Sequence, residues 1–138
     1  MTPVIRQLGT AALGAAMFVA ACAGGTDTPL EEIQRVRSGD LDIVLLSEDG
    51  ALNQGKDAFV IEFRKSDGSL QDVGTVTTSA NMPMPGMTMP GSVQVARSDV
   101  PGRYRATGEF GMAGGWQMKV DWSGAAGQGS VSFDGTVQ

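Results

Sequence analysis

Short runs in which apolar and polar residues alternate recur along the chain, and they constrain its fold most. Apolar side chains at every second position, as at Phe59, Ile61 and Phe63, indicate strands with one buried face. Turn-forming pairs such as Asp67-Gly68 separate the runs. Seven strands are predicted in this way: LDIVLLS (41–47), AFVIEFRK (58–65), VGTVTTS (73–79), SVQVARS (92–98), RYRATGEF (103–110), WQMKVDW (116–122) and SVSFDGTV (130–137).

Helical periodicity is nearly absent after residue 21, so these strands predict an all-β fold, an antiparallel sandwich with an immunoglobulin-like arrangement. Removing the first 21 of the 138 residues leaves 117, a length that suits one domain with a single core. We expect this domain to span residues 39–138. The chain has one cysteine, so no disulfide within it is available and stability must come from packing.

The first 21 residues have the pattern of an export signal. Arg6 precedes a run of small and apolar residues, LGTAALGAAMFVA. The single cysteine, Cys22, directly follows the sequence VAA, an order that resembles the lipobox of bacterial lipoproteins. We therefore predict a signal peptide over residues 1–21 and lipidation of Cys22. An uncleaved anchor, or a cysteine that lies by chance near an ordinary cleavage site, is the alternative.

Lipidation of Cys22 predicts where the protein is found. Ala23 follows the cysteine, and in Gram-negative lipoproteins a residue other than Asp at this position implies the outer membrane. The expected location is the periplasmic side of that membrane, with the lipid as a partner. The segment AGGTDTPLEE lacks periodicity and is rich in small and polar residues. We expect residues 22–38 to form a flexible tether.

Charge and residue types exclude several functions. Without Arg6, 9 basic residues remain against 15 acidic ones, a net charge of −6 that disfavours nucleic acid as a partner. The chain contains no histidine, and lipidation would consume its only cysteine, so the usual general base and the Cys/His nucleophile pairs are missing. Ser66 beside Lys65 falls in a predicted turn. We expect a protein that is not an enzyme.

Residues 81–91, NMPMPGMTMPG, concentrate four methionines around prolines and glycines. If Pro85-Gly86 occupies the centre of a tight turn, Met84 pairs with Met87, and the next methionine of each strand pairs in the same way. Alternation then places four thioethers on one face, those of Met82, Met84, Met87 and Met89. A looser loop with clustered methionines is the alternative, because the turn types that Pro-Gly favours splay hairpin strands.

Thioethers suggest a soft metal. They select Cu(I) among biological metals, whereas zinc prefers Cys and His, and Cu(II) prefers nitrogen donors such as imidazole. No acidic residue lies between Asp72 and Asp99, which disfavours calcium and magnesium. The sequence therefore predicts a Cu(I) site formed by the four methionines. Methionine also fills gaps in cores and lines adaptable binding surfaces, so packing or contact with a partner protein is the competing interpretation.

Three further elements have structural interpretations. Trp116 and Met118 alternate with Val120, so we expect them in the core. Tyr104 is expected to bury its ring and to hydrogen-bond a neighbouring loop through its hydroxyl, as in a tyrosine corner. The sequence leaves open whether Met112 approaches the four methionines.

The order MPMPGM, then Gly102-x-Tyr104, then Met112-x-Gly114-x-Trp116-x-Met118-x-Val120 resembles the YtkA-like domain family, which is similar to FixH proteins. The resemblance covers about residues 40–122. It implies an immunoglobulin-like domain in an exported or membrane-attached bacterial protein, with an association with heavy-metal efflux and copper-dependent oxidase assembly. The positions that match the motif are Met82, Pro83, Met84, Met87, Gly114 and Trp116.

One departure from the family pattern concerns the metal. Many relatives have a histidine just after the methionine-proline segment, where this chain has Thr88 and Met89. The departure disfavours Cu(II) and zinc and leaves a thioether Cu(I) site open. Two functions remain. The protein either binds Cu(I) for homeostasis or delivery to an efflux or oxidase-assembly partner, or it is a noncatalytic interaction module whose methionines pack the domain or dock a protein.

Overall fold

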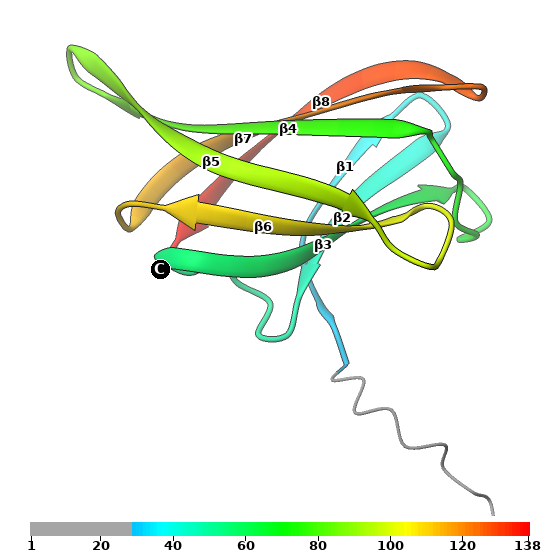
Figure 1. Ribbon diagram of the computed structural model, residues 1–138, viewed down its shortest axis with the longest axis horizontal. Coiled ribbons are helices and arrows are strands. Elements are labelled where there is room, and N and C mark those ends of the chain that lie inside the picture. Colours follow the sequence, from blue (N-terminus) through cyan, green and yellow to red (C-terminus); the bar gives the residue numbers. More distant parts are fainter. Residues whose placement is uncertain (1–28) are drawn as a thin grey trace, which may run out of the picture.

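In a computed structural model of the chain, residues 29–138 are described and form eight β-strands (Figure 1). The predicted signal peptide, Cys22 and the first part of the predicted tether lie outside the described residues. Residues 29–138 include no helix long and apolar enough to cross a membrane. The strands are β1 (Glu31–Ser38), β2 (Leu41–Ser47), β3 (Gly55–Lys65), β4 (Thr75–Met84), β5 (Met87–Arg97), β6 (Arg103–Phe110), β7 (Gly114–Gly124) and β8 (Gly127–Val137).

The strands form one antiparallel sheet in the order β1-β2-β3-β6-β5-β4-β7-β8, folded into two layers (Figure 1). If β2 to β8 are lettered A to G, the order becomes A-B-E-D followed by C-F-G. This is the strand arrangement of the two sheets of an immunoglobulin constant-type domain. The predicted all-β sandwich is confirmed, with β1 added at the edge beside β2.

Strand β5 joins the two layers by changing partners along its length. Its first residues, Met87 to Gly91, pair with β4, and Ser92 to Arg97 pair with β6. Gly91, at the change of partner, faces the ring of Trp116. A Cβ placed at Gly91 would lie 2.8 Å from Cζ3 of that ring, so only glycine allows this close approach without a shift. β5 therefore has one end in each layer.

Aromatic side chains from both layers meet in the core. The ring of Phe63 on β3 lies 5.2 Å from that of Trp122 on β7, and Phe110 on β6 lies 5.3 Å from Trp116 on β7, both in edge-to-face arrangements. The predictions that Trp116 and Met118 belong to the core are confirmed, because each is only 3% exposed. The core thus fixes β7 against β6 at the end where the hairpin of β4 and β5 leaves the sheet.

The predicted boundary between tether and domain was wrong. Residues 31–38, assigned to a tether over 22–38, form strand β1 and pair with β2, so the folded domain begins before residue 39. The pairing shifts between Glu32 and Gln34, which makes Ile33 the extra residue of a bulge. Ile33 and Val36 both pack on the core three positions apart. The bulge therefore hides the period of two that marks the other strands.

Candidate metal centre

The four methionines of the 81–91 segment lie on a tight β-hairpin. Met84 pairs with Met87 and Met82 pairs with Met89, which confirms the predicted register. Gly86 has a φ of 79°, close to the value that the second central residue of a type II turn requires. The turn is therefore Pro85-Gly86, and the looser loop is not observed.

The prolines mark where this hairpin leaves the rest of the sheet. β4 pairs with β7 only as far as Asn81, two residues before Pro83. β5 pairs with β6 only from Ser92, two residues after Pro90. A proline has no N–H to donate, so these positions suit strand segments without a neighbour on that side. The end of the hairpin, residues 82–90, projects as a two-stranded ribbon (Figure 1).

All four thioethers share one face of this ribbon, because cross-strand partners lie on the same side and successive side chains alternate. Their exposure rises toward the tip. Met82 is 7% exposed, Met84 and Met89 are half-buried against the core, and Met87 is 60% exposed. The face therefore runs from a buried base to an open tip.

The β6–β7 loop, residues 111–113, lies against the base of the ribbon. A Cβ at Gly114 would be 2.6 Å from Cε of Met82, and one at Gly111 would be 3.8 Å from Sδ of Met89. Met112, 40% exposed, lies between these two glycines, and its carbonyl accepts a hydrogen bond from Nε1 of Trp116 at 2.9 Å. Met112 therefore belongs to a loop that borders the methionine face, whereas Met118 is a core residue.

The sequence did not reveal this loop contact. Glycines that leave room for methionine side chains carry no periodic signal, and the two segments are more than twenty residues apart. The nearest clue was Met112 itself, which precedes Gly114 in the motif.

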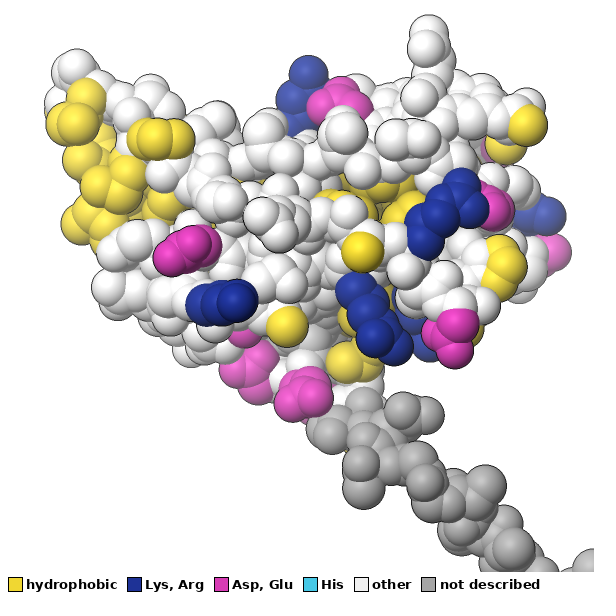
Figure 2. All heavy atoms as spheres, viewed as in Figure 1, with side chains coloured by type: hydrophobic (Ala, Val, Ile, Leu, Met, Phe, Trp, Pro, Cys, Tyr) yellow, Lys and Arg dark blue, Asp and Glu magenta, His cyan; other side chains and the backbone are white. Residues whose placement is uncertain are grey.

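Figure 2 shows hydrophobic side chains gathered over the end of the molecule where the hairpin projects.

The two segments that form and border this methionine face carry no charge. No charged residue occurs between Asp72 and Arg97, or between Glu109 and Lys119. Within residues 29–138, no group of three or more His, Cys, Asp or Glu side chains is placed to hold a metal ion. The donors here are neutral sulfurs on a face that is open at one end. This donor set fits a soft, singly charged ion and not a hard divalent one.

The other singled-out residues occupy structural positions. Tyr104 is 2% exposed, and its hydroxyl donates to the carbonyl of Gly74 at 2.9 Å, as predicted for a bond to a neighbouring loop. Lys65 and Ser66 lie at a turn after β3, where the backbone N–H of Lys65 donates a hydrogen bond to the carbonyl of Ser69. Neither site adjoins the methionine face.

A comparison with protein families gives a match that includes this part of the chain. The profile of YtkA-like proteins matches residues 35–121. The chain belongs to the YtkA-like family. The YtkA-like region extends from within β1 to within β7, so it contains the methionine hairpin and the β6–β7 loop. A comparison with curated proteins gives no match.

Proposed function

We propose that this YtkA-like protein binds Cu(I) through Met82, Met84, Met87 and Met89, and that it serves copper homeostasis or copper delivery without catalysing a reaction. One observation carries the proposal: the hairpin register places these four thioethers on one face. Thioethers are soft donors that favour Cu(I), and the chain has no imidazole that would favour Cu(II).

The gradient of exposure suggests how the ion would enter. Met87 and the half-buried Met84 form the closing pair next to the turn, where solvent reaches the sulfurs. The next pair, Met82 and Met89, lies deeper, and Met82 is its buried member. An ion arriving at the tip meets Met87 first and then Met84 and Met89. The hairpin and the β6–β7 loop carry no charged side chain, so they neither repel a cation nor offer carboxylates to divalent ions that prefer oxygen.

The position of the hairpin suits a protein held at a membrane. We propose that the mature chain is exported and anchored through lipidated Cys22 to the periplasmic side of the outer membrane, as the N-terminal sequence predicts. The hairpin tip and the start of the described chain lie at opposite ends of the molecule (Figure 1). The copper site would then face away from the lipid, toward an efflux or oxidase-assembly partner.

The exposure of the tip favours a second function. Met87 is 60% exposed and the neighbouring Pro85 is also exposed, so the ribbon presents an apolar tip to solvent. Adaptable methionine surfaces bind proteins, and a noncatalytic docking module would use this tip without metal.

A Cu(I) titration under anaerobic conditions tests the proposal. We expect one equivalent of Cu(I) to bind and the double variant Met84→Leu/Met87→Leu to bind it more weakly, because leucine keeps the volume but removes the donor. Met118→Leu is the matched control, since it removes a thioether from the core. Circular dichroism verifies the fold of each variant. Equal Cu(I) affinity in the double variant and the wild type would leave protein docking as the function.

A further inference from the structure

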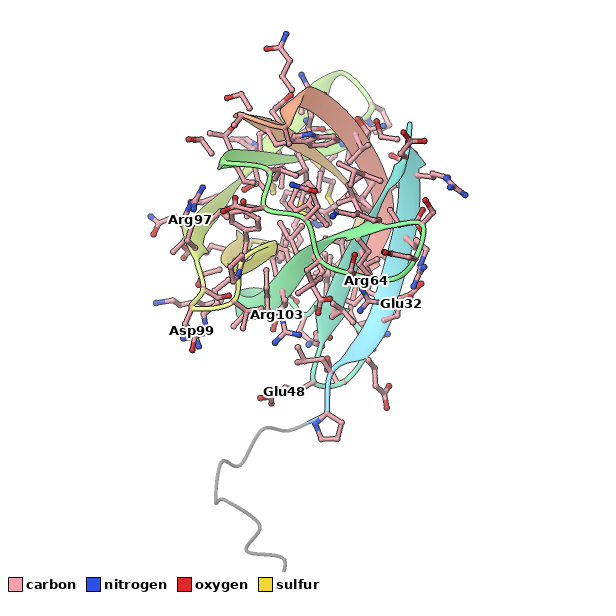
Figure 3. The ribbon with its side chains drawn as sticks, turned by 90° about the vertical axis from the view of Figure 1, so that its right-hand side faces the viewer. Glu32, Glu48, Arg64, Arg97, Asp99 and Arg103 are labelled. Atoms are coloured by element: carbon pink, nitrogen blue, oxygen red, sulfur yellow. The ribbon has the colours of Figure 1, made fainter. Side chains whose placement is uncertain are left out.

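A cavity of about 710 Å³ opens on the outer face of β2, β3 and β6, away from the methionine hairpin. Leu46 and Val60 give it apolar walls, and Glu62, Arg103 and Arg105 line it with charge. Figure 3 shows Asp99, Arg103 and Glu48 at the end of the molecule where the described chain begins. Nothing in the proposed copper function uses this cavity.

Arg103 has donors that its neighbours leave unused. The Glu62 side chain is only 5% exposed. One of its oxygens, Oε2, accepts a hydrogen bond from Nε of Arg64 at 3.0 Å and forms an ion pair with Nη2 of Arg64 at 2.9 Å. Arg64 alone therefore balances this carboxylate. Arg103 approaches the other oxygen, Oε1, at 3.2 Å. Its Nε is the one buried side-chain nitrogen or oxygen without a hydrogen-bond partner in the described residues. This Nε is shielded from solvent, whereas the side chain as a whole is 39% exposed, so an anion would approach the guanidinium through its terminal nitrogens.

Arg105 extends the positive charge along the same wall. It lies two residues from Arg103 on β6, so both side chains are on the outer face. Arg105 is exposed and forms no ion pair within residues 29–138. Arg64, Arg103 and Arg105 against Glu62 give the wall formed by β3 and β6 a net charge of +2, in a protein whose overall charge is negative.

The segments that follow β2 and β5 bring the opposite charge to the cavity. Glu48 follows β2 and Asp99 follows β5, and neither carboxylate forms an ion pair with another described residue. These two carboxylates disfavour polyanions, and the arginines disfavour simple cations. A ligand that matches both parts carries an anionic group for the arginines and a cationic group for the carboxylates.

We propose that this cavity binds a small zwitterion, with a phosphate or carboxylate at Arg103 and Arg105 and an ammonium group toward Glu48 and Asp99. The apolar walls accommodate the carbon atoms between the two charges. Phosphoethanolamine has this chemistry, either as a free compound or as the head group of a phospholipid. Pro29 and Leu30 line the cavity, and Pro29 is seven positions after Cys22, a stretch that spans at most about 25 Å. A lipid anchor at Cys22 would keep such head groups within reach.

Isothermal titration of the purified protein with phosphoethanolamine tests the site, with inorganic phosphate and ethanolamine as half-ligands. We expect phosphoethanolamine to bind at least about tenfold more tightly than either half-ligand, because only the complete zwitterion engages both charged parts. Arg105→Gln should weaken its binding about tenfold, and Lys119→Gln, on the other sheet, is the control that removes the same charge. Asp99→Asn should weaken the binding of phosphoethanolamine but not of inorganic phosphate.

Two results would overturn the proposal: affinity for phosphoethanolamine no higher than for a half-ligand, or equal affinity in Arg105→Gln and Lys119→Gln. Competition then identifies the source of the ligand. Two kinds of vesicle are compared: phosphatidylcholine alone, and phosphatidylcholine with phosphatidylethanolamine. If only the second kind displaces phosphoethanolamine, the site is supported and its ligand is a lipid head group. Absence of displacement in a protein that binds phosphoethanolamine supports the site and assigns a free compound. Loss of copper binding in Met84→Leu/Met87→Leu leaves these results unchanged.

Discussion

The methyl group of Met82 occupies the space where a side chain on Gly114 would lie, with a Cβ there only 2.6 Å from Cε. Gly114 also has a φ of 138°, a region that residues with a Cβ rarely adopt. The base of the methionine hairpin and the start of β7 therefore depend on each other. A substitution at this glycine changes both the backbone and the position of a proposed ligand.

Gly114→Ala should lower the free energy of unfolding by about 1–3 kcal/mol, chiefly through its unfavourable φ. The flexible end of Met82 can move aside, so the Met82 methyl resonance should shift in NMR spectra. Gly115→Ala is the control, since Gly115 has open space at its Cβ and no positive φ. Urea denaturation measures the stability of both. Similar losses of stability in the two variants would show that the positive φ of Gly114 does not set the cost of an added Cβ.

Tyr104→Phe should reduce stability by about 1 kcal/mol, because the hydroxyl that donates to the Gly74 carbonyl is lost. The buried ring keeps its packing against Phe63, whose centroid lies 5.4 Å away, so the fold should persist. Asp72, whose Oδ1 lies 3.3 Å from the hydroxyl, would lose a second contact. Thermal or urea denaturation at neutral pH gives the value. An unchanged midpoint would mean that water replaces this bond without cost.

The same tyrosine predicts a loss of stability at alkaline pH. Burial, followed by the negative charge of Asp72, raises the pKa of Tyr104 above its ordinary value of 10.0. The stabilisation is thus fully present below the unfolded-state pKa, near 10, and is lost as pH rises through the folded-state pKa. Tyr104→Phe should show less alkaline loss than the wild type. Because the chain has one tyrosine, its ultraviolet absorbance reports the titration directly. A midpoint at 10 or below would contradict this prediction.

The hairpin register could be predicted from sequence because every determinant is local. Pro85-Gly86 specifies the turn, and pairing outward from it fixes Met84 with Met87 and Met82 with Met89. The strands 41–47 and 103–110 were likewise predicted to the residue, since turn-forming residues bound a continuous apolar run in the first and an alternating run in the second. Local pattern and global fold agree in these segments.

Features that depend on distant contacts were not predictable. The bulge at Ile33 breaks the alternation of β1, so that strand resembled a tether. The exchange of partners along β5 depends on the close approach of Gly91 to Trp116, which sequence spacing does not encode. The cavity at Arg103 arises because β6 lies beside β3 and not beside β7, its neighbour in the chain.

The gradient of exposure predicts the order in which the methionines oxidise. Dilute hydrogen peroxide should convert Met87 and Met112 to sulfoxides first, at 60% and 40% exposure, and Met82 and Met118 last. Peptide mapping by mass spectrometry follows each site. Equal rates at Met87 and Met82 would contradict the observed burial.

Glu62→Gln should destabilise the fold by about 2–4 kcal/mol, because it leaves Arg64 and Arg103 facing a neutral amide in a partly buried site. The carboxylate is 5% exposed while the two arginines retain 28% and 39% exposure, which places the cost below that of a fully enclosed pair. Glu109→Gln, at an exposed position on β6, should change stability by less than about 0.5 kcal/mol. The difference should persist in 1 M salt, since ions screen buried pairs poorly. If both variants lose the same amount of stability and salt removes that loss, Glu62 contributes no more than an exposed surface ion pair.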